Sequence, residues 1–588
     1  MRRSLFSALS NYFYFGYSNK LILQNCRLIT IRKKHTKFVN EDGIIRSEFV
    51  PVPTASISVH DTLLDAIWRH SLKQPGKAAF ISAEYPEQQI TFSEFLLQCH
   101  SVAQFLESIG VGKGQIGGVV VHNCWQFLAV FLGASMQGGC ISGANPQLTE
   151  DELAYQFNEI KCRVTFCSDF LLDKMKVVMQ KCPNLKHLVL IPSQHPPIHS
   201  NTLLPPNIHN WTDIIEKRPK IDRKLPEINI EKDFAYLPFS SGTTGPSKGV
   251  MLSHKNVGTM LNIFNTHFDE RIVQRLIFQW DWKKEHTLLM LPLYHIYGFI
   301  LGLNCLLTGS TGIMMKKFDL DLFCRVVQEY KLKYATLVPP ILVLLAKNSK
   351  LISRYDLSSL RFVMTGAAPI ADEICTEIKK QIPSIVQIAQ GYGMTEQSMC
   401  SHLPVFGMEN QKAAGRLISN FEMKIVDIDK GMTLKLRQVG EICTRSPTVM
   451  LGYLNKPEAT ADTIDAEGWL KTGDIGYHDE SGWTFIVDRL KELIKVNGLQ
   501  VAPAELEGLL LAHPDIKDCA VIGVPDKLSG EVPKAFIVPE NEKLTEEQVK
   551  KFLKDKLANY KQIKFVQFVQ TIPKSPSGKI LRRLLRDI

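Results

Sequence analysis

The sequence predicts an α/β fold of layered subdomains with largely parallel strands. Between residues 78 and 365, short apolar runs of strand length alternate with longer stretches of helical periodicity. This alternation is typical of parallel sheets covered by helices. The length of 588 residues and the 45% hydrophobic content allow more than one buried core. The clearest strand-like runs are Val119–Val121, Val164–Cys167, Leu188–Ile191 and Thr287–Leu291.

Two stretches depart from this alternation. Gly117–Cys140 is the most apolar part of the chain, but four polar residues interrupt it. No apolar run reaches the roughly 18 residues that a membrane span needs, so we expect no transmembrane segment here but a strand followed by a buried helix. Leu203–Lys232 contains four prolines and predicts an irregular surface connection.

The positive charge of the chain is concentrated at its N-terminus. The formal net charge is +10, but eight of the 69 Lys and Arg residues lie in residues 1–40, before the first acid. The rest carries 61 basic and 59 acidic side chains, without the basic bias of a nucleic-acid-binding protein. Residues 1–40 are rich in Arg and Ser, which is typical of a mitochondrial transit peptide. A disordered extension without targeting value is the alternative.

The predicted location is therefore mitochondrial, with cytoplasmic or peroxisomal location as alternatives. The last residues, Arg586-Asp587-Ile588, do not match a peroxisomal Ser-Lys-Leu ending. Thirteen cysteines occur without CxxC spacing, and the odd number leaves at least one unpaired. This argues against a disulfide framework or a zinc site and predicts core thiols in a reducing compartment.

The most informative stretch is Leu237–His254, which reads LPFSSGTTGPSKGVMLSH. An apolar run from Phe234 to Phe239 predicts a buried strand, and Ser253 is a suitable cap for a helix that starts near His254. Glycines and hydroxyl side chains between them can direct N–H and O–H groups at one anion, and a lysine adds a mobile charge. These residues are Ser240, Ser241, Gly242, Thr243, Thr244, Gly245 and Lys248. They predict a polyphosphate site, or else an ordinary surface turn.

Two glycine-containing motifs then follow strand-like runs. Thr365–Pro369 reads TGAAP, and Gln390–Glu396 reads QGYGMTE. Their glycines let the backbone approach a flat base, and Tyr392 can stack on it. Thr395 can hold a phosphate oxygen, and Glu396 is a hard oxygen ligand for Mg²⁺. Each motif taken alone could be a simple turn.

Two motifs offer a carboxylate and an imidazole. Gly468–Asp474 reads GWLKTGD, and a carboxylate beside a tight glycine turn can accept both hydroxyls of a ribose. Leu291–Gly298 reads LPLYHIYG, which places His295 among aromatic residues. A histidine in such a strand is either a satisfied core residue or a site residue.

The last motifs are rich in lysine. Val487–Glu507 reads VDRLKELIKVNGLQVAPAELE, and by composition it could be an amphipathic segment with a solvated basic face. Lys574–Leu581 reads KSPSGKIL, a loop from which Lys579 could reach into a site. Lys317, in the sequence KKF, is either solvated or a ligand contact.

In this order the motifs resemble those of the adenylate-forming superfamily, which includes acyl-CoA synthetases, 4-coumarate–CoA ligases, firefly-type luciferases and nonribosomal adenylation domains. The motif sequences are most similar to those of the acyl-CoA and 4-coumarate–CoA ligases. The resemblance extends from about residue 42 to the C-terminus. The resemblance implies a large N-terminal AMP-binding domain at 41–490. A small, mobile α+β domain at 491–588 would close over it.

The resemblance also implies the reaction. A small-molecule carboxylic acid would attack MgATP to give an acyl-adenylate and pyrophosphate, and CoA would then form a thioester and release AMP. ATP, Mg²⁺ and coenzyme A are the implied cofactors. The implied catalytic residues are Lys248, His295, Thr395, Glu396 and Lys579.

Further roles are carried over from the family residue by residue. Besides the phosphate loop and the catalytic residues, the implied nucleotide contacts are Gln390, Gly391, Tyr392, Asp474, Arg489 and Lys491, the last also at the hinge between the two domains. Lys495 and Gln500 would serve either AMP or the CoA channel. Lys317, Asn497 and Gly498 would serve CoA. His295, Tyr297, Gly366 and Ala367 would line the acyl pocket. Glu396 and Thr243 would hold the metal.

The sequence departs from the family in two places. Pro246-Ser247 replaces the usual Leu-Pro before Lys248, which leaves the hydroxyls, glycines and lysine in place. Asn497 stands where the ligases commonly have lysine, which weakens the expected contact to CoA. The apolar residues Leu301 and Met364 would suit a fatty or an aromatic acid.

Two other functions compete with CoA ligation. An adenylating enzyme could pass the acyl group to a carrier protein or to oxygen, although no Leu-Gly-Gly-x-Ser carrier site follows. A non-catalytic adenylate-binding protein would be expected to have lost a lysine or carboxylate of the motifs. All of them are present in this chain.

Overall fold

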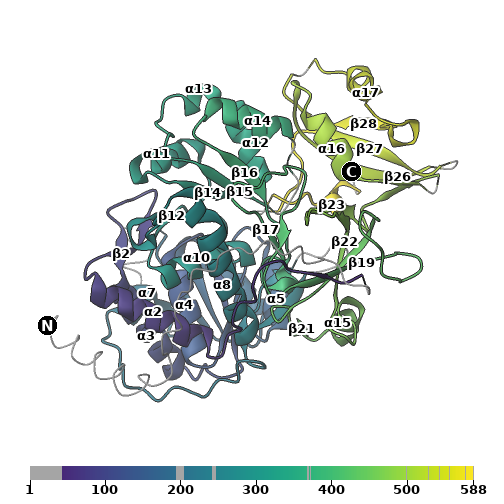
Figure 1. Cartoon of the computed structure of the whole chain (residues 1–588). Coiled ribbons are helices and arrows are strands. Elements are labelled where there is room, and N and C mark those ends of the chain that lie inside the picture. The colour runs from purple at the N-terminus through teal and green to yellow at the C-terminus, as the bar shows by residue number, and fades with distance from the viewer. Residues whose placement is uncertain are drawn as a thin grey trace.

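The computed structural model describes residues 43–193, 204–240, 247–366, 370, 372–497, 499–526, 529–541, 543–554, 556–575 and 578–586. The predicted leader, the loop residues Ser241–Gly245, Ala367 and Gly498 lie outside these described residues, as does the side chain of Gln500. Figure 1 shows a larger unit and, against one end of it, a smaller unit formed by the C-terminal part of the chain. This two-part α/β architecture confirms the predicted fold class. The predicted limits 41–490 and 491–588 stay predictions.

The largest sheet of the described chain has the order β10-β11-β9-β5-β4-β6-β7-β8, with β21 paired to β11. Strands β5, β4, β6 and β7 run parallel, in agreement with the predicted alternation. Every residue of β4, β5 and β6 is buried, because helices cover both faces of such a sheet. The strands are β4 (Ile116–Val120), β5 (Cys140–Gly143), β6 (Val164–Ser168), β7 (His187–Ile191), β8 (Ile208–Asn210), β9 (Phe234–Tyr236), β10 (Phe239–Ser240), β11 (Lys248–Ser253) and β21 (Gly452–Tyr453).

Two smaller sheets complete the parallel layers of the larger unit. One has the order β12-β13-β2-β3, with only β3 antiparallel, and the other has the order β14-β15-β16. Their strands are β2 (Ala78–Ser82), β3 (Gln89–Thr91), β12 (His286–Leu289), β13 (Thr311–Met314), β14 (Tyr334–Leu337), β15 (Phe362–Thr365) and β16 (Gln387–Gln390). The predicted strand at residues 287–291 is β12, one residue earlier at its start.

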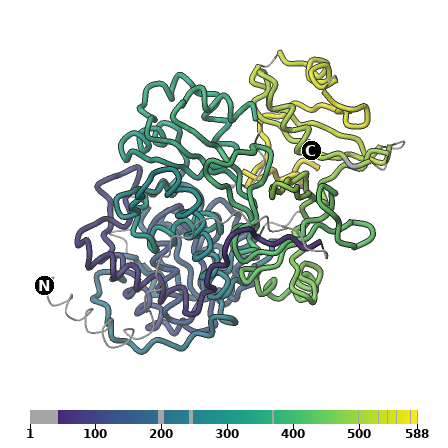
Figure 2. Tube along the Cα trace, viewed as in Figure 1, coloured from purple at the N-terminus to yellow at the C-terminus, as the bar shows by residue number. Residues whose placement is uncertain are grey.

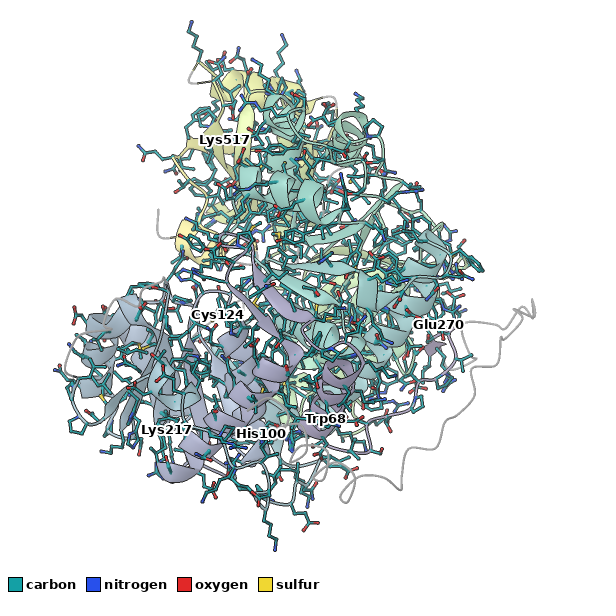
Figure 3. The ribbon with its side chains drawn as sticks, turned by 90° about the vertical axis from the view of Figure 1, so that its left-hand side faces the viewer. Trp68, His100, Cys124, Lys217, Glu270 and Lys517 are labelled. Carbon is teal, nitrogen blue, oxygen red and sulfur yellow. The ribbon has the colours of Figure 1, made fainter. Side chains whose placement is uncertain are left out.

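Helices fill the space between these sheets. Ten of the twelve residues of α4 are buried, so Gly117–Cys140 forms a strand and a buried helix as predicted. None of the described helices is long and apolar enough to span a membrane. Figure 3 shows Trp68 of α2 and His100 of α3 in the larger unit and Lys517 on the smaller unit. The main helices are α2 (Val59–Lys73), α3 (Phe92–Ser108), α4 (Trp125–Met136), α5 (Glu150–Glu159), α6 (Leu172–Lys181), α8 (His254–Phe268), α10 (Ile296–Thr308), α11 (Leu320–Tyr330), α12 (Pro339–Lys347) and α14 (Asp372–Gln381).

An antiparallel sheet closes the larger unit, with the order β1-β19-β20-β22-β23. Figure 2 shows the purple N-terminal stretch crossing to the green part of the chain, where β1 pairs with β19. A short pair, β17 (His402–Leu403) and β18 (Arg416–Leu417), lies separately. The sheet consists of β1 (Ile45–Arg46), β19 (Glu422–Val426), β20 (Gly440–Arg445), β22 (Leu470–His478) and β23 (Thr484–Arg489).

The smaller unit has its own sheet and its own apolar core. The sheet has the order β25-β24-β27-β26, with β28 parallel to β27. Its core is formed by buried residues between Ile494 and Ile563, separate from the main core. The elements are β24 (Ile494–Val496), β25 (Leu499–Val501), α16 (Pro503–Leu511), β26 (Ile516–Asp526), β27 (Gly530–Pro539), α17 (Glu546–Lys554), β28 (Phe565–Phe568) and α18 (Arg582–Leu585).

The stretch Leu203–Lys232 corrects one prediction. Its described part is not irregular throughout, because β8 extends the largest sheet and α7 (Trp211–Ile215) follows it. Ile208 and Trp211 are buried, and this apolar burial outweighs the nearby prolines. The twelve described cysteines are all free thiols, and eleven are buried, as the sequence predicts.

Candidate functional site

The phosphate-loop motif begins and ends on two paired strands. Ser240, at the end of β10, pairs with Lys248, at the start of β11. Antiparallel pairing therefore brings the two ends of the predicted loop together, although Ser241–Gly245 lie outside the described residues. The Nζ atom of Lys248 lies 4.8 Å from the centre of the Tyr453 ring, close enough for a cation–π contact.

The helix after the loop begins as the sequence predicts. Ser253 caps α8, and its side chain accepts a hydrogen bond from the backbone N–H of Asn256 at 3.1 Å. The Asn256 side chain donates to the carbonyl oxygens of Pro447 and Val449, both at 2.9 Å. The start of α8 thereby fixes the segment that leads to β21 and Tyr453.

Glu396 is a buried carboxylate in a short turn, η4 (Thr395–Gln397), and is 5% exposed. The Tyr453 hydroxyl donates to its Oε1 atom at 2.9 Å, and its backbone oxygen accepts from the N–H of Met450 at 2.9 Å. In the described part of the chain no Lys or Arg forms a salt bridge with Glu396, and no cluster of three acidic, His or Cys ligands occurs. A buried carboxylate with one neutral donor suits a hard cation whose other ligands come from a nucleotide and water. The half-buried Thr395 precedes it.

A second carboxylate, Asp474, lies opposite Arg489 in the pairing of β22 with β23. Asp474 is 3% exposed, and its Oδ1 atom forms an ion pair of 3.0 Å with Nε of Arg489. The Tyr392 hydroxyl donates to Oδ2 of Asp474 at 2.6 Å. Tyr392, Asp474 and Arg489, expected to hold base and ribose, thus form one hydrogen-bonded group.

The two glycine loops expected beside the base lie against each other. The N–H of Gly391 donates to the carbonyl oxygen of Thr365 at 2.8 Å, which continues the pairing of β15 with β16. A Cβ atom on Gly366 would lie 3.1 Å from the carbonyl oxygen of Gly391. The close approach therefore favours glycine at position 366. The Gln390 side chain donates to the carbonyl oxygen of Gln411 at 2.5 Å.

Lys579 enters this group from the smaller unit. Burial lowers the pKa of Lys579 to about 8, and Arg489 lowers it too, whereas Glu492, Asp474 and Glu396 oppose the shift. This C-terminal lysine therefore lies within electrostatic reach of motif residues of the larger unit, and two of them, Asp474 and Glu396, precede it by more than a hundred positions. Composition and periodicity carry no information about this long-range approach, which only the family resemblance implies.

His295 lies at the start of α10 and faces the same lysine. Its Nδ1 atom accepts a hydrogen bond from the N–H of Tyr297 at 3.3 Å, which leaves the proton of the neutral ring on Nε2. Burial lowers the pKa of His295 to about 4, and the charge of Lys579 adds to this effect. Burial raises the pKa of Tyr297, which lies near Cys400. His295 is therefore a neutral donor at physiological pH.

The remaining predicted residues lie at the surface. Lys317, Lys491, Lys495 and Asn497 are exposed. Asn497 has φ +51°, in the left-handed region that asparagine adopts more readily than lysine. The departure from the family's lysine therefore has a backbone reason. Leu301 and Met364, proposed for the acyl pocket, are buried in the main core.

Sequence reasoning missed Tyr453, which binds Glu396 and contacts Lys248. It also missed Arg582, which follows Lys579 by three positions and binds Glu492 and Glu507. Lys579 lies in a loop and α18 begins only at Arg582, so the spacing of three residues carried no helical signal for Arg582. Nothing in the sequence around Tyr453 points to a carboxylate partner.

Comparisons with known proteins agree with this geometry. The family model described as AMP-binding enzyme matches residues 67–454, and the model of the AMP-binding enzyme C-terminal domain matches residues 505–579. The 4-coumarate–CoA ligase-like 2 of Arabidopsis thaliana is 40% identical over 521 residues, covering 87% of this chain and 88% of the relative. The 4-coumarate–CoA ligase 1 of Arabidopsis thaliana is 36% identical over 570 residues, covering 95% and 97%.

Solved structures share the fold. The crystal structure of an anthranilate CoA ligase with anthranoyl-AMP superposes with a TM-score of 0.78 at 24% identity, covering 92% of this chain and 98% of that chain. ATP-bound MatB from Rhodopseudomonas palustris gives a TM-score of 0.75 at 24% identity, covering 90% and 99%. The predicted recognition and enzyme class are thus confirmed: the chain belongs to the AMP-binding enzyme family, that is, to the adenylate-forming enzymes.

Proposed function

We propose that the chain is an AMP-forming acid–thiol ligase that converts a carboxylic acid to its CoA thioester through an acyl-adenylate. One observation carries this proposal: Lys579, half-buried on the smaller unit, lies close enough to Glu396, Asp474 and Arg489 of the larger unit for their charges to act on it. An adenylation site needs such a cation, because two anions must meet in the first step. The names of the relatives, 4-coumarate–CoA ligases, support the choice of CoA as acceptor.

In the first half-reaction, an oxygen of the substrate carboxylate bonds to the α-phosphorus of ATP, and the bond from that phosphorus to the bridging oxygen of pyrophosphate breaks. Negative charge grows on the phosphoryl oxygens and on the leaving group. Lys579 and Lys248 would stabilise this charge together with the N–H groups expected in the phosphate loop. The neutral His295 could donate its Nε2 proton to an oxygen of the acyl-adenylate.

Asp474 and Arg489 would hold the sugar of the nucleotide, and Tyr392 would keep that carboxylate in place through its hydroxyl group. A Mg²⁺ ion bound with ATP would add charge neutralisation at the phosphates. Glu396 is the described carboxylate that fits such an ion, and Thr243 is the second predicted ligand.

In the second half-reaction, the sulfur of CoA bonds to the acyl carbon while the bond to the AMP oxygen breaks. The proton of the thiol passes to water, and AMP leaves with the electrons of the broken bond. Lys317, Lys495, Asn497 and Gly498 are the residues proposed to serve CoA. Lys317 and Lys495 are exposed, which would let them meet a phosphate of an incoming ligand.

A panel of carboxylic acids tests the whole proposal. Pyrophosphate release is measured with octanoate, cinnamate, 4-coumarate and no acid, and thioester is then measured with CoA. Leu301 and Met364 are buried in the main core and give no preference between octanoate and 4-coumarate, so the panel decides between a fatty and an aromatic acid. Acid-dependent pyrophosphate release without thioester would indicate another acceptor, and no release with any acid would reject the proposal.

We also propose that residues 1–40 direct the protein to mitochondria, on the basis of their charge and composition. A fusion of residues 1–40 to a fluorescent reporter should accumulate in mitochondria, while residues 41–588 should remain an active enzyme. A variant with the eight basic residues of the leader changed to Gln is the matched control. A diffuse cytosolic signal from the unchanged leader would reject this proposal.

A further inference from the structure

Helix α16 of the smaller unit begins without a cap of its own. Its N-cap residue is Ala502, which makes no side-chain cap bond, and Pro503 occupies the first turn. The first N–H groups of a helix have no partner within the helix, and Ser, Thr, Asp or Asn at the N-cap commonly accepts one of them. Here the acceptor comes from another element. The N–H of Ala504 donates to Oδ2 of Asp488 at 3.1 Å.

Asp488 belongs to β23, the last strand of the larger unit. The side chain is 7% exposed, and its Oδ1 atom accepts from the N–H of Arg489 at 2.7 Å. Both carboxylate oxygens are therefore engaged. Ile475, Leu493 and Ala502 form a small apolar cluster between the sheet of the larger unit and the start of α16. The cap therefore bridges the two units over an apolar contact.

A short series of contacts leads from α16 to the catalytic lysine. Glu507, one turn after Ala504, accepts two hydrogen bonds from Nη2 of Arg582, at 2.8 and 2.7 Å. Arg582 also binds Glu492 through Nη1 and donates from Nε to the carbonyl oxygen of Val521. Since Arg582 follows Lys579 by three residues, we expect a displacement of α16 to shift the loop of Lys579.

The carboxylate of Asp488 lies among charged groups. Burial raises the pKa of Asp488 to about 6, Arg582 opposes this rise, and Glu492 adds to it. Glu507 lies close enough to Asp488 for the two carboxylates to disfavour each other's charge. Arg582 is the cation that these carboxylates share. The cap is therefore part of one buried ionic group.

We propose that Asp488 is a positioning residue for the adenylation step: by capping α16 across the boundary between the two units, it holds Lys579 beside Glu396 and Asp474. The inference rests on the proposed function for the identity of that step. It predicts that loss of the cap impairs the half-reaction that uses Lys579 and leaves the other intact.

The experiment compares both half-reactions in the full chain for Asp488→Ala, Asp488→Asn and Thr91→Ala. Thr91 caps α3 within the larger unit, so its variant is a matched loss of a cap away from the boundary. Loss of a cap should slow acid-dependent pyrophosphate release about five- to tenfold in Asp488→Ala. Thioester formation from preformed acyl-adenylate and CoA should stay within about twofold. Asp488→Asn, which keeps an acceptor oxygen, should retain at least half of the wild-type rate of release, and Thr91→Ala should affect neither step selectively.

Hydrogen exchange supplies a readout that does not depend on activity. The amide of Ala504 should exchange faster in Asp488→Ala than in wild type, Asp488→Asn or Thr91→Ala. Unchanged exchange, or equal slowing of both half-reactions, would overturn the inference. A wild-type protein that releases no pyrophosphate with any acid would reject the proposed function, and faster exchange in Asp488→Ala would still support the cap.

Discussion

Glu396 and Lys579 reach the same site by different routes. Glu396 is fixed from within the larger unit, where the hydroxyl of Tyr453 and the N–H of Met450 hold its side chain and backbone. Lys579 is brought by a loop of the smaller unit, and its position depends on how that unit sits. The carboxylates are thus held within one unit, whereas we expect a rigid-body movement of the smaller unit to withdraw the lysine.

The loop of Lys579 meets the larger unit closely. Gly578 has φ +83°, and a Cβ atom there would lie 2.8 Å from Cγ of Pro340 at the start of α12. The backbone conformation and the contact both favour glycine. Lys495 of the same unit is instead exposed on β24. In this orientation the smaller unit therefore presents Lys579 to the site and leaves Lys495 outside it.

The largest effect expected is that of Lys579→Ala. The charge that develops at phosphorus loses its partner, so pyrophosphate release should fall by about 10²–10³. The same variant should still make thioester from preformed acyl-adenylate and CoA. Rapid quench with both substrates separates the two steps. Equal slowing of both half-reactions would refute the view that Lys579 serves only the adenylation step.

Lys495→Ala should show the opposite selectivity. If movement of the smaller unit brings Lys495 to the site for the second step, loss of its charge should slow thioester formation about ten- to hundredfold. Pyrophosphate release should change little. The measurement is the same pair of assays, with the exposed Lys517 of β26 changed to Ala as control. A larger slowing of adenylation than of thioester formation would contradict a role of Lys495 in the second half-reaction.

The pKa of Lys579 gives a dependence on pH. Because burial lowers this pKa to about 8, the lysine of the free enzyme is charged below pH 8 and loses its proton above it. The value of kcat/KM for pyrophosphate release should therefore fall about tenfold per pH unit above 8. Lys579→Arg, whose guanidinium stays charged, should lack this fall. A wild-type profile that is flat from pH 7.5 to 9.5 would rule out Lys579 as the titrating group.

Tyr453→Phe tests the fixed part of the site and should have the smallest effect. The variant removes one hydrogen bond to the buried Glu396 and keeps the ring that Lys248 faces. Pyrophosphate release should slow about fivefold, with a higher requirement for Mg²⁺. The control is Tyr355→Phe, at an exposed hydroxyl that donates to Asp321. An unchanged Mg²⁺ requirement would show that the hydroxyl of Tyr453 does not act on metal binding by Glu396.

Much of the larger unit could be predicted from local pattern. Apolar runs such as Val164–Cys167 became parallel strands, and Ser253 capped a helix at His254, because these features depend on neighbours in sequence. The strand β8 was missed because Pro205 and Pro206, just before it, give a local signal against a buried strand. The local pattern thus succeeds where the deciding contacts are close in sequence.

The contacts within the site also divide into those between residues close in sequence and those between distant elements. The pairing of Asp474 with Arg489 follows from a hairpin, so its two members lie close in sequence. The contacts of Tyr453 with Glu396, 57 positions apart, and of Arg582 with Glu507, 75 positions apart, join elements that are distant in sequence. Periodicity carries no information about such pairs, because it reports which face of an element is buried and not what covers it.

The pairing of β1 with β19 has a consequence for the order in which the chain is made. Arg46 and Glu422 form an ion pair of 2.8 Å across 376 positions, and Glu48 binds Arg416 in the same region. On the ribosome, residues 45–48 therefore emerge long before their partners exist, whereas β4 to β7 can pair within one short span of synthesis. Closing so long a loop costs entropy that only the later contacts repay. The beginning of the described chain is thus among the last parts to gain its native partner.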